Sequence, residues 1–520
     1  MDLLKRNIHM DRMRCEAVTQ ITLEDDRNIP DSKPDVSGIS LEKASVVVDE
    51  VKPGNDVVVL SGKLHFCILY HTPEAGCGLV LLEGDLPFEE KLMMKGVTLS
   101  DSVKALGEVE DFAVSVINSR KLGLRSLITL SACVEELYDE EVPIGVHMED
   151  EKAVVCEYRK CPTQIAQIAI FKNDVYRIRE EVTLPSNLPN ISQILWSDIE
   201  TADVEFKLLD EMLQIKGDVH IFLLYEGEGE EHPVQFYESV VPFAGNLECH
   251  GCREGMLPNI QFQMGQPEIV VKPDLDGEER CISLELALDI AIRIYEEEQV
   301  DIVTDMYGVT RKIETSTQLA RLCRVKACMT GKTKVTDHIR IPGGGAPILQ
   351  VLHSQGEICQ GQTEVVEEGI LLKGGICIKV LYITGDDEHP YASVTAQLPY
   401  RYVLEIPNMQ PQDIGKVRAC MEQLQVTMLD GEEMDVKAIL EFATVVFEQK
   451  EQKLIRQLQV TDLDSDTYRE LPGMAIYMVR EGDNLWSIGR KYYMPVQKIK
   501  DLNQLTTDEI NPGQKLLLVK

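Results

Sequence analysis

An internal repeat with the period of a whole domain constrains the fold of this chain more than any other feature. In three strand-like segments a glycine is followed eight residues later by a tyrosine, and a proline-aromatic pair stands 25 residues after each glycine. The three sets are Gly62, Tyr70 and Pro87-Phe88; Gly217, Tyr225 and Pro242-Phe243; and Gly374, Tyr382 and Pro399-Tyr400. Because the glycines are 155 and 157 residues apart, each unit is long enough to form a complete domain.

Apolar residues within each unit alternate as they do in half-buried strands. In the first unit Leu64, Phe66 and Ile68 stand at every second position, and the other two units show the same spacing with many β-branched residues. An aliphatic residue also precedes each glycine by 26 positions, at Val36, Ile191 and Ile348. We therefore predict a mainly β fold with three repeated antiparallel β-domains.

Turn sequences and long apolar runs complete the prediction for each unit. Hairpin-type turns stand at Gly227-Glu228-Gly229, Asp276-Gly277, Gly385-Asp386-Asp387 and Asp430-Gly431. The second of these joins 269–271 to 281–294, and the last joins 424–428 to 436–446. The units end in apolar runs at 127–134, 282–294 and 439–447, as expected for long strands that leave a sandwich. The stretch 284–298 also fits a helix. Residues 448–474 are rich in Glu, Gln and Asp, which is typical of a linker.

The last 45 or so residues follow a different pattern, which predicts a small β-α-α-β domain. Tyr477 and Val479 alternate with polar neighbours as in a strand, and Gly482-Asp483 supplies a turn. Asn484 is suited to cap a helix whose apolar face would be Leu485, Ile488 and Tyr492. Pro495 is suited to open a second helix with Val496, Ile499 and Leu502 on its apolar side. After the turn at Asn511-Pro512-Gly513, residues 515–519 can pair with the first strand.

These residues, together with Asn503 and the run from Ile510 to Leu516, resemble a LysM module. LysM modules generally bind glycans that contain N-acetylglucosamine, in a groove between two loops. The resemblance implies a groove formed by Gly482, Asp483, Asn484, Leu485 and Trp486 on one side and Asp508, Glu509, Ile510 and Asn511 on the other. Asn484 stands where the pattern more often has Thr or Ser. Leu485 fits a core position better than a binding one, and Trp486 fits either equally well.

The charge of the chain excludes several kinds of partner. The net charge is −35, whereas residues 475–520 carry seven Lys or Arg and five Asp or Glu, so the rest of the chain carries −37. Nucleic acid is therefore not an expected ligand, because binding to phosphates requires clustered positive charge. An acidic membrane surface is disfavoured for the same reason. Five of these seven positive residues, Arg480, Arg490, Lys491, Lys498 and Lys500, favour an acidic protein surface as partner.

Cysteine usage and the N-terminal residues indicate a reducing compartment. Charged residues interrupt every apolar run in 1–14, so we expect no secretory signal, and no 18-residue apolar stretch predicts a transmembrane helix. Several of the fourteen cysteines, such as Cys67, Cys281 and Cys377, lie in apolar strand-like runs, where a free thiol acts as a small hydrophobe. The pair Cys249 and Cys252 lacks a partner pair at zinc-finger spacing, so we expect neither a metal nor a cofactor.

No catalytic constellation emerges from the residues. Gly343-Gly344-Gly345 lacks the Lys-Ser/Thr of a phosphate-binding loop, and none of the 87 carboxylates is marked by its setting as a glycosidase acid or base. His65 and His220 occupy the same repeat position, and we interpret them as structural strand residues. We therefore expect a binding protein, with an enzyme such as a LysM-targeted glycan hydrolase as a less favoured alternative.

Three repeats ahead of a LysM module are similar to the SipL-like spore coat morphogenetic proteins, in which SPOCS domains precede LysM. The resemblance divides the chain into repeats at 1–160, 161–310 and 311–460, a linker at 461–474 and a LysM domain at 475–520. It implies a cytoplasmic, non-enzymatic scaffold in the mother cell, at the forespore surface. Its implied partners are the SpoIVA-type coat morphogenetic ATPase, bound through LysM, and other coat proteins. Binding of peptidoglycan or cortex glycan by LysM is the alternative.

Overall fold

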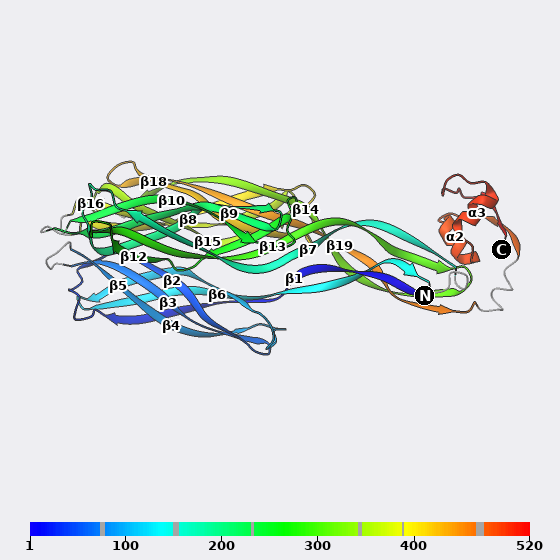
Figure 1. Cartoon of the computed structure of the whole chain (residues 1–520), viewed down its shortest axis with the longest axis horizontal. Coiled ribbons are helices and arrows are strands. Elements are labelled where there is room, and N and C mark those ends of the chain that lie inside the picture. Colours follow the sequence, from blue (N-terminus) through cyan, green and yellow to red (C-terminus); the bar gives the residue numbers. More distant parts are fainter. Residues whose placement is uncertain are drawn as a thin grey trace.

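The chain forms a broad head, a long stalk and a small domain at the far end of the stalk (Figure 1). The structure is a computed structural model that describes residues 1–72, 78–148, 155–229, 233–341, 346–386, 389–463 and 473–519. Strands build the head and the stalk, and the two described helices, α2 and α3, lie in the small domain. The prediction of a mainly β fold followed by a β-α-α-β domain is therefore confirmed.

Repeat 1, which comprises β1 to β6, is a sandwich of two three-stranded antiparallel sheets. One sheet has the strand order β2-β3-β4 and the other β1-β6-β5. The strands are β1 (Asp2–Asn28), β2 (Gly38–Pro53), β3 (Val57–His71), β4 (Leu79–Met93), β5 (Lys104–Asn118) and β6 (Lys121–His147). The inner faces of the two sheets share one apolar core, to which Phe66 and Leu130 belong.

Repeats 2 and 3 have the same plan. In repeat 2, β10-β9-β8 faces a sheet in which β13 pairs with β7, β11 and β12; in repeat 3, β15-β16-β17 faces β14-β19-β18. The strands of repeat 2 are β7 (Cys156–Thr183), β8 (Ile191–Leu209), β9 (Met212–Gly227), β10 (Val234–Glu248), β11 (Leu257–Met264), β12 (Glu268–Pro273) and β13 (Glu279–Gly308). Those of repeat 3 are β14 (Lys312–Arg340), β15 (Ile348–Val366), β16 (Gly369–Thr384), β17 (Tyr391–Glu405), β18 (Ile414–Met428) and β19 (Glu433–Thr461). The turns at 276–277 and 430–431 join β12 to β13 and β18 to β19, as predicted.

The glycine of each repeat lies directly across the ladder from the repeated aromatic residue. Gly62 pairs with Phe88, Gly217 with Phe243 and Gly374 with Tyr400. A Cβ added to any of these glycines would lie 2.9 Å from an atom of the opposing aromatic side chain. The ring thus covers the bare backbone of the glycine, which is the arrangement that compensates for glycine in a sheet. The repeated tyrosines are buried, with Tyr70 and Tyr225 fully inaccessible.

The stalk consists of the outer ends of three long two-stranded ribbons, one from each repeat. The paired strands β1 and β6, β7 and β13, and β14 and β19 are each 27 to 30 residues long. Side chains from all three ribbons form a shared apolar core: Ile8, Met10, Val142, Ile165, Val300, Ile302, Ala320, Leu322 and Leu454. A polar contact also joins the three repeats, since Asp11 of β1 accepts hydrogen bonds from Tyr295 of β13 at 3.0 Å and Lys416 of β18 at 2.5 Å.

One alternative and one prediction about the long strands do not hold. The stretch 284–298, which also fits a helix, is part of β13, as the predicted apolar strand at 282–294 requires, because its buried residues stand at every second position up to Ile294. Residues 448–461 belong to β19 and not to a linker. Their polar side chains alternate with buried ones such as Leu454, as a stalk ribbon with one wet face requires. Residues 464–472 of the predicted linker lie outside the described residues, as do Gly343, Gly344 and Gly345.

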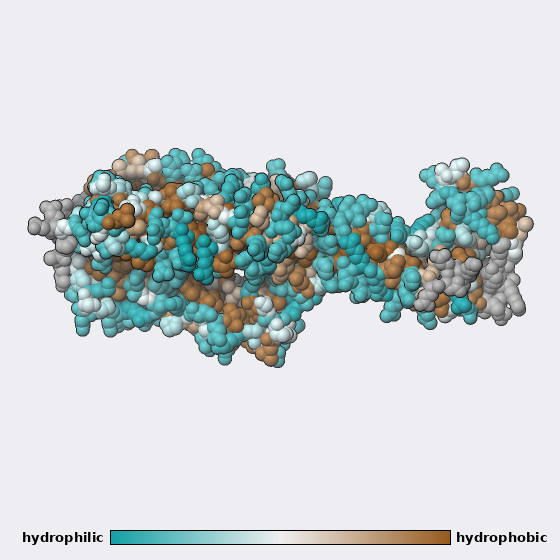
Figure 2. Space-filling view, viewed as in Figure 1, coloured by the Kyte–Doolittle hydropathy of each residue, from teal (hydrophilic) through white to brown (hydrophobic). Residues whose placement is uncertain are grey.

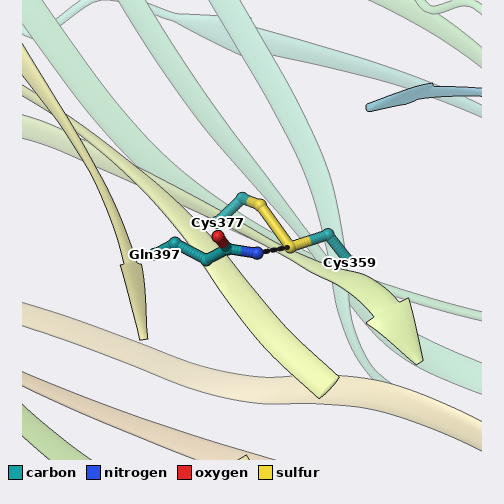
Figure 3. The surroundings of a disulfide bond; sticks show 3 residues. All are labelled: Cys359, Cys377 and Gln397. Carbon is teal, nitrogen blue, oxygen red and sulfur yellow. Dashed lines mark hydrogen bonds between the residues drawn. A yellow bond between two sulfur atoms is a disulfide. The ribbon is translucent and has the colours of Figure 1, made fainter. Parts of the chain in front are cut away.

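One cysteine prediction is also corrected. Cys377 of β16, expected to be a free thiol, forms a disulfide with Cys359 of β15, with the two Cα atoms 6.2 Å apart (Figure 3). The side-chain amide of Gln397 on β17 lies 3.5 Å from the Cys359 sulfur. The antiparallel register brings together residues 18 positions apart in the sequence, which the pattern of one strand alone cannot show. Cys359 and Cys377 are therefore oxidised, contrary to the prediction of free thiols, whereas Cys67 and Cys281 are free thiols as predicted.

Candidate binding site in the LysM domain

The small domain is a two-stranded ribbon covered by two helices. Its elements are β20 (Met474–Met478), α2 (Leu485–Tyr492), α3 (Val496–Asn503) and β21 (Lys515–Val519), and β20 pairs with β21. Asn484 caps α2 as predicted: its Oδ1 accepts from the Ser487 backbone N–H at 2.8 Å, and the Ser487 hydroxyl lies 3.1 Å from the Asn484 backbone nitrogen. Pro495 is the residue before α3 and not its first residue.

The core of this domain explains its apolar spacing. Leu485, Ile488, Ile499 and Leu516 are buried together between the helices and the ribbon. The side chain of Asn503 joins α3 to β21, because its amide donates to the Leu517 carbonyl at 2.8 Å and its oxygen accepts from the Leu517 N–H at 2.6 Å. Helices of eight residues are marginal alone, so these contacts hold them in place.

The two loops predicted to form the groove leave the same end of the ribbon. Met478, the last residue of β20, pairs with Lys515, the first residue of β21. Beyond this pair the Val479 N–H donates to the Gln514 carbonyl at 2.9 Å, and the Gly513 N–H donates to the Val479 carbonyl at 2.8 Å. The nine predicted site residues therefore stand on two adjoining loops and the start of α2.

The nine residues differ in their accessibility. Gly482, Asn484, Asp508, Glu509 and Asn511 are exposed, and Asp483 and Ile510 are half-buried. Leu485 and Trp486 are buried, at 2% and 7% exposure. Leu485 lies in the core of the domain. The surface of the two loops is thus polar, with amide or carboxylate groups on both.

Local contacts fix the charges around the groove. The Tyr477 hydroxyl donates to Asp483 at 2.7 Å and the Arg480 backbone N–H donates at 2.8 Å, which hold the pKa of Asp483 below its usual range. Lys500 pairs with Asp508 at 2.7 Å, and Arg490 pairs with Asp305 of the stalk. Two of the five expected basic residues are thus already paired within the chain.

Trp486 packs against the tip of the ribbon formed by β7 and β13. Its indole N–H donates to Asp305 at 2.8 Å, the Tyr307 ring meets it edge to face at 4.7 Å, and the Arg159 guanidinium lies 4.5 Å from the ring centre. The Tyr307 hydroxyl also donates to the Met494 carbonyl at 2.8 Å. We call these three residues, Arg159, Asp305 and Tyr307, the stalk dock.

The stalk dock was not foreseen from the sequence. Asp305 and Trp486 are 181 residues apart, and nothing in either local pattern marks them as partners. Burial and the hydrogen bond to Asp305 both hold Trp486 in place, and burial raises the pKa of Tyr307 above its ordinary value. The LysM domain is therefore attached to the stalk by an aromatic contact with polar partners on two sides.

The cysteine pair considered as a metal site is buried in a turn of repeat 2. Cys249 and Cys252 are both inaccessible, and the Cys252 thiol donates to the Leu209 carbonyl at 2.8 Å. Burial raises the pKa of the Cys249 thiol to about 11. His250 between them is exposed and lies 3.3 Å from Glu211. Both thiols are thus packed inside this turn and closed to solvent.

Comparison with protein families identifies both parts of the chain. A SipL, SPOCS domain model matches residues 35–117, 190–271 and 347–429, and a LysM domain model matches residues 477–519. The three SPOCS matches run from just before β2, β8 and β15 to β5, β12 and β18, so each contains one whole sheet and part of the facing sheet. The chain is therefore a protein of repeated SPOCS domains with a LysM domain. It has the SipL-like architecture, as predicted.

The curated relatives match over short segments. The chain is 46% identical over 50 residues to the N-acetylmuramoyl-L-alanine amidase sle1 of Staphylococcus saprophyticus, covering 10% of this chain and 15% of the amidase. It is 44% identical over 48 residues to the Bacillus subtilis protein YkzQ, covering 9% of this chain and 64% of that protein. The chain thus spans less than two thirds of the length of either relative. No solved structure matches the chain.

SPOCS and LysM domains are binding and scaffold domains. Their presence supports a sporulation-related scaffold with a LysM binding module. Neither described helix is long enough to cross a bilayer, since each has eight residues.

Proposed function

We propose that the protein is a non-enzymatic scaffold of spore coat assembly whose LysM domain binds a SpoIVA-type coat morphogenetic ATPase at the forespore surface, in the mother-cell cytoplasm. The observation that carries this proposal is the placement of the LysM domain. It stands at the tip of the stalk, far from the head, with five of its nine groove residues exposed. A module presented in this way can reach one partner while the head contacts others.

The head supports the second half of the scaffold role. Its three sandwiches share an apolar core where the repeats meet, including Leu69, Leu224 and Leu381 from the three central strands. The view in Figure 2 shows a largely hydrophilic surface on this face of the head, and the chain outside the LysM segment carries −37. A single acidic body of this size offers surface for further coat proteins.

Glycan binding is the second candidate function. It is supported by the LysM match and by the similarity to an N-acetylmuramoyl-L-alanine amidase. The exposed oxygens and amides of Asn484, Asp508 and Asn511 are groups that can hydrogen-bond sugar hydroxyls. Under this alternative, the ligand would be peptidoglycan or cortex glycan with N-acetylglucosamine units.

A binding titration of the full chain distinguishes the two candidates. Wild type and Glu509→Arg are titrated against a purified SpoIVA-type ATPase and against N-acetylglucosamine oligomers. Glu509 is exposed at the groove, so the variant places a bulky opposite charge there without disturbing the core. We expect wild type to bind the ATPase and Glu509→Arg to strengthen that binding by about tenfold, or about 1.4 kcal/mol, because the proposed partner surface is acidic. The matched control is Glu254→Arg, at an exposed position of repeat 2.

The salt dependence of binding gives an independent check. Arg480, Lys491 and Lys498 are exposed on the LysM domain, so an acidic partner surface should bind more weakly as salt rises. Tight binding of the oligomers by wild type, with no binding of the ATPase, would replace the proposal with the glycan alternative. Equal binding by Glu509→Arg and wild type would remove the groove from the contact.

A further inference from the structure

Three side chains on neighbouring strands of repeat 1 bring three metal-binding atoms together. His65 and Cys67 are two residues apart on β3, so they project from the same face of the sheet. Glu83 of β4 lies directly across the ladder from Cys67, and Asp85 lies across from His65. The ligand atoms of His65, Cys67 and Glu83 all lie within 4.8 Å of one another.

The separations suit one tetrahedral ion. His65 Nε2 is 3.6 Å from Cys67 Sγ, and Cys67 Sγ is 3.7 Å from Glu83 Oε1. A zinc ion with bonds of about 2.3 Å to sulfur and about 2.0–2.1 Å to nitrogen and oxygen would hold such atoms roughly 3.3–3.6 Å apart. The two separations from sulfur differ from these values by a few tenths of an ångström at most, and the third, between His65 Nε2 and Glu83, is within 4.8 Å, so the ion can enter after side-chain adjustment.

Asp85 sets the histidine in the form that a metal requires. Its carboxylate lies 2.8 Å from His65 Nδ1, and a carboxylate can only accept there, so the ring proton stays on Nδ1. The lone pair of Nε2 is then directed toward Cys67. A carboxylate behind a metal-binding histidine is the usual supporting contact in zinc sites. Lys63 pairs with the other oxygen of Asp85 at 3.0 Å and keeps it out of the ligand set.

The proposed site lies between an apolar cluster and the solvent. Cys67 packs against the apolar cluster where the three repeats meet, while Glu83 is exposed. One side of the site is thus shielded, and the other is open to an incoming ion and to water as a fourth ligand. A thiolate and a carboxylate together match the two positive charges of the ion.

Cys67 is not a requirement of the repeated fold. At the positions of Cys67 and Asp85, repeat 2 has Phe222 and Val240, and the same sheet forms there, whereas His220 and Glu238 stand at the positions of His65 and Glu83. Sulfur, imidazole and carboxylate together favour zinc over magnesium or calcium, which take oxygen ligands.

We propose that repeat 1 binds one zinc ion through His65 Nε2, Cys67 Sγ and Glu83 Oε1, with water as the fourth ligand and Asp85 as the residue that orients the histidine. As the zinc–sulfur bond forms, the thiol proton of Cys67 passes to solvent. Cys67 then holds β3 to β4 through the ion.

The test uses the full chain after removal of metal with a chelator. Zinc is titrated in competition with a chromophoric chelator, and cobalt is titrated while the absorption spectrum is followed. We expect one zinc per chain, and a cobalt spectrum with a thiolate charge-transfer band and the visible bands of tetrahedral coordination. Cys67→Ser should abolish the charge-transfer band, and Asp85→Asn should weaken zinc binding by about 10- to 100-fold.

Two further variants keep the test decisive. Glu83→Gln changes an exposed side chain, so it should weaken zinc binding while the circular dichroism spectrum stays unchanged. The double variant Cys249→Ser with Cys252→Ser removes the two neighbouring thiols of repeat 2, which lie outside the proposed site, and should bind zinc as wild type does. The proposal is overturned if wild type binds no zinc, if the charge-transfer band persists in Cys67→Ser, or if the band disappears in the double variant.

Discussion

Lys43 and Asp198 occupy the same position in two different repeats and form an ion pair with each other. Each stands 19 residues before the repeated glycine of its unit, and the Lys43 ammonium lies 2.6 Å from the Asp198 carboxylate. The equivalent residue of repeat 3, Gln355, donates to the same carboxylate at 3.2 Å. One repeated position thus supplies a cation, an anion and an amide that meet where the repeats pack together.

This cluster is buried and strongly coupled. The Asp198 side chain is 1% exposed, and His353 also lies 2.9 Å from its carboxylate. Burial opposes the charge on Asp198, but Lys43 and His353 hold its pKa below the usual range. Three identical residues here would leave like groups facing one another, so the three different residues favour one arrangement of the repeats.

Removing the charge of Asp198 should therefore destabilise the head. Asp198→Asn leaves the half-buried Lys43 ammonium without its anion and removes the acceptor of His353, and breaking a buried pair in this way costs about 3–5 kcal/mol. Urea unfolding followed by circular dichroism measures the loss. The matched control is Lys52→Ala, which breaks the exposed pair with Glu50 and should leave the unfolding midpoint unchanged. A midpoint for Asp198→Asn equal to that of wild type would show that the cluster is dispensable.

His353 makes the stability of the head depend on pH. Burial disfavours its charge, but the hydrogen bond to Asp198 and the Glu238 carboxylate 3.9 Å away outweigh burial and raise the pKa of His353 to about 9. Because this value lies above the unfolded value of about 6.5, the stabilisation is complete below about pH 6.5 and is lost as the pH rises through about 9. The difference corresponds to a contribution on the order of 3 kcal/mol.

The measurement is the difference between wild type and His353→Gln in free energy of unfolding across this pH range. We expect the difference to shrink toward high pH. Burial raises the pKa of the neighbouring Glu200 to about 7, so Glu200 also changes its charge in this pH range. Because both proteins contain Glu200, subtracting their free energies of unfolding reduces its contribution. A difference that stays constant with pH would mean that His353 is neutral in the folded head.

The repeated glycine should tolerate no side chain. In Gly217→Ala the new Cβ would lie 2.9 Å from the Phe243 ring and 3.1 Å from the Ala202 carbonyl oxygen. Both neighbours are held in the sheet, so the variant should lose about 1–3 kcal/mol, as overpacked cores do. Gly473→Ala is the control, because nothing lies within 4 Å of its added Cβ. Thermal unfolding compares the two, and equal melting temperatures would contradict the assigned role of Gly217.

The fold could be predicted from the sequence because its main signals are local and repeated. Strand alternation, hairpin turns and the Gly-Tyr-Pro-aromatic frame all depend on residues close in the chain. The cap at Asn484 and the apolar faces of α2 and α3 are also local, so the LysM domain was recognised residue by residue. The sequence alone does not show why the glycine and the aromatic residue recur together. The strand register shows the reason, because it places Gly217 directly across from Phe243.

The missed features all depend on long-range pairing. The polar residues at 448–461 indicated a linker, yet they line one face of a ribbon whose partner strand β14 begins at Lys312. The disulfide between Cys359 and Cys377 follows from the pairing of β15 with β16. The stalk dock joins Trp486 to residues of β7 and β13, and Asp305 stands 181 positions before Trp486. The local pattern therefore predicts the helix that carries Trp486 but not the residues that surround its ring.

The orientation of the LysM domain should depend on the stalk dock. Asp305 accepts from the Trp486 indole and pairs with Arg490, so Asp305→Ala removes both contacts at once. The chain contains two tryptophans, and Trp196 is buried in the head, so a Trp196→Phe background leaves Trp486 as the one indole reporter. We expect Asp305→Ala to shift its fluorescence emission to longer wavelength, because the released ring enters water.

The matched control is Asp301→Ala, an exposed aspartate four residues earlier on β13, which should leave the emission unchanged.

Titration with the SpoIVA-type ATPase then separates two roles of Trp486. If the ring only fixes the domain to the stalk, Trp486→Ala and Asp305→Ala change binding equally. If the ring itself contacts the partner, Asp305→Ala strengthens binding by freeing it and Trp486→Ala weakens binding, since loss of a central tryptophan typically costs about 2 kcal/mol or more. Because Trp486 is 7% exposed and held on three sides by Arg159, Asp305 and Tyr307, we expect the first result.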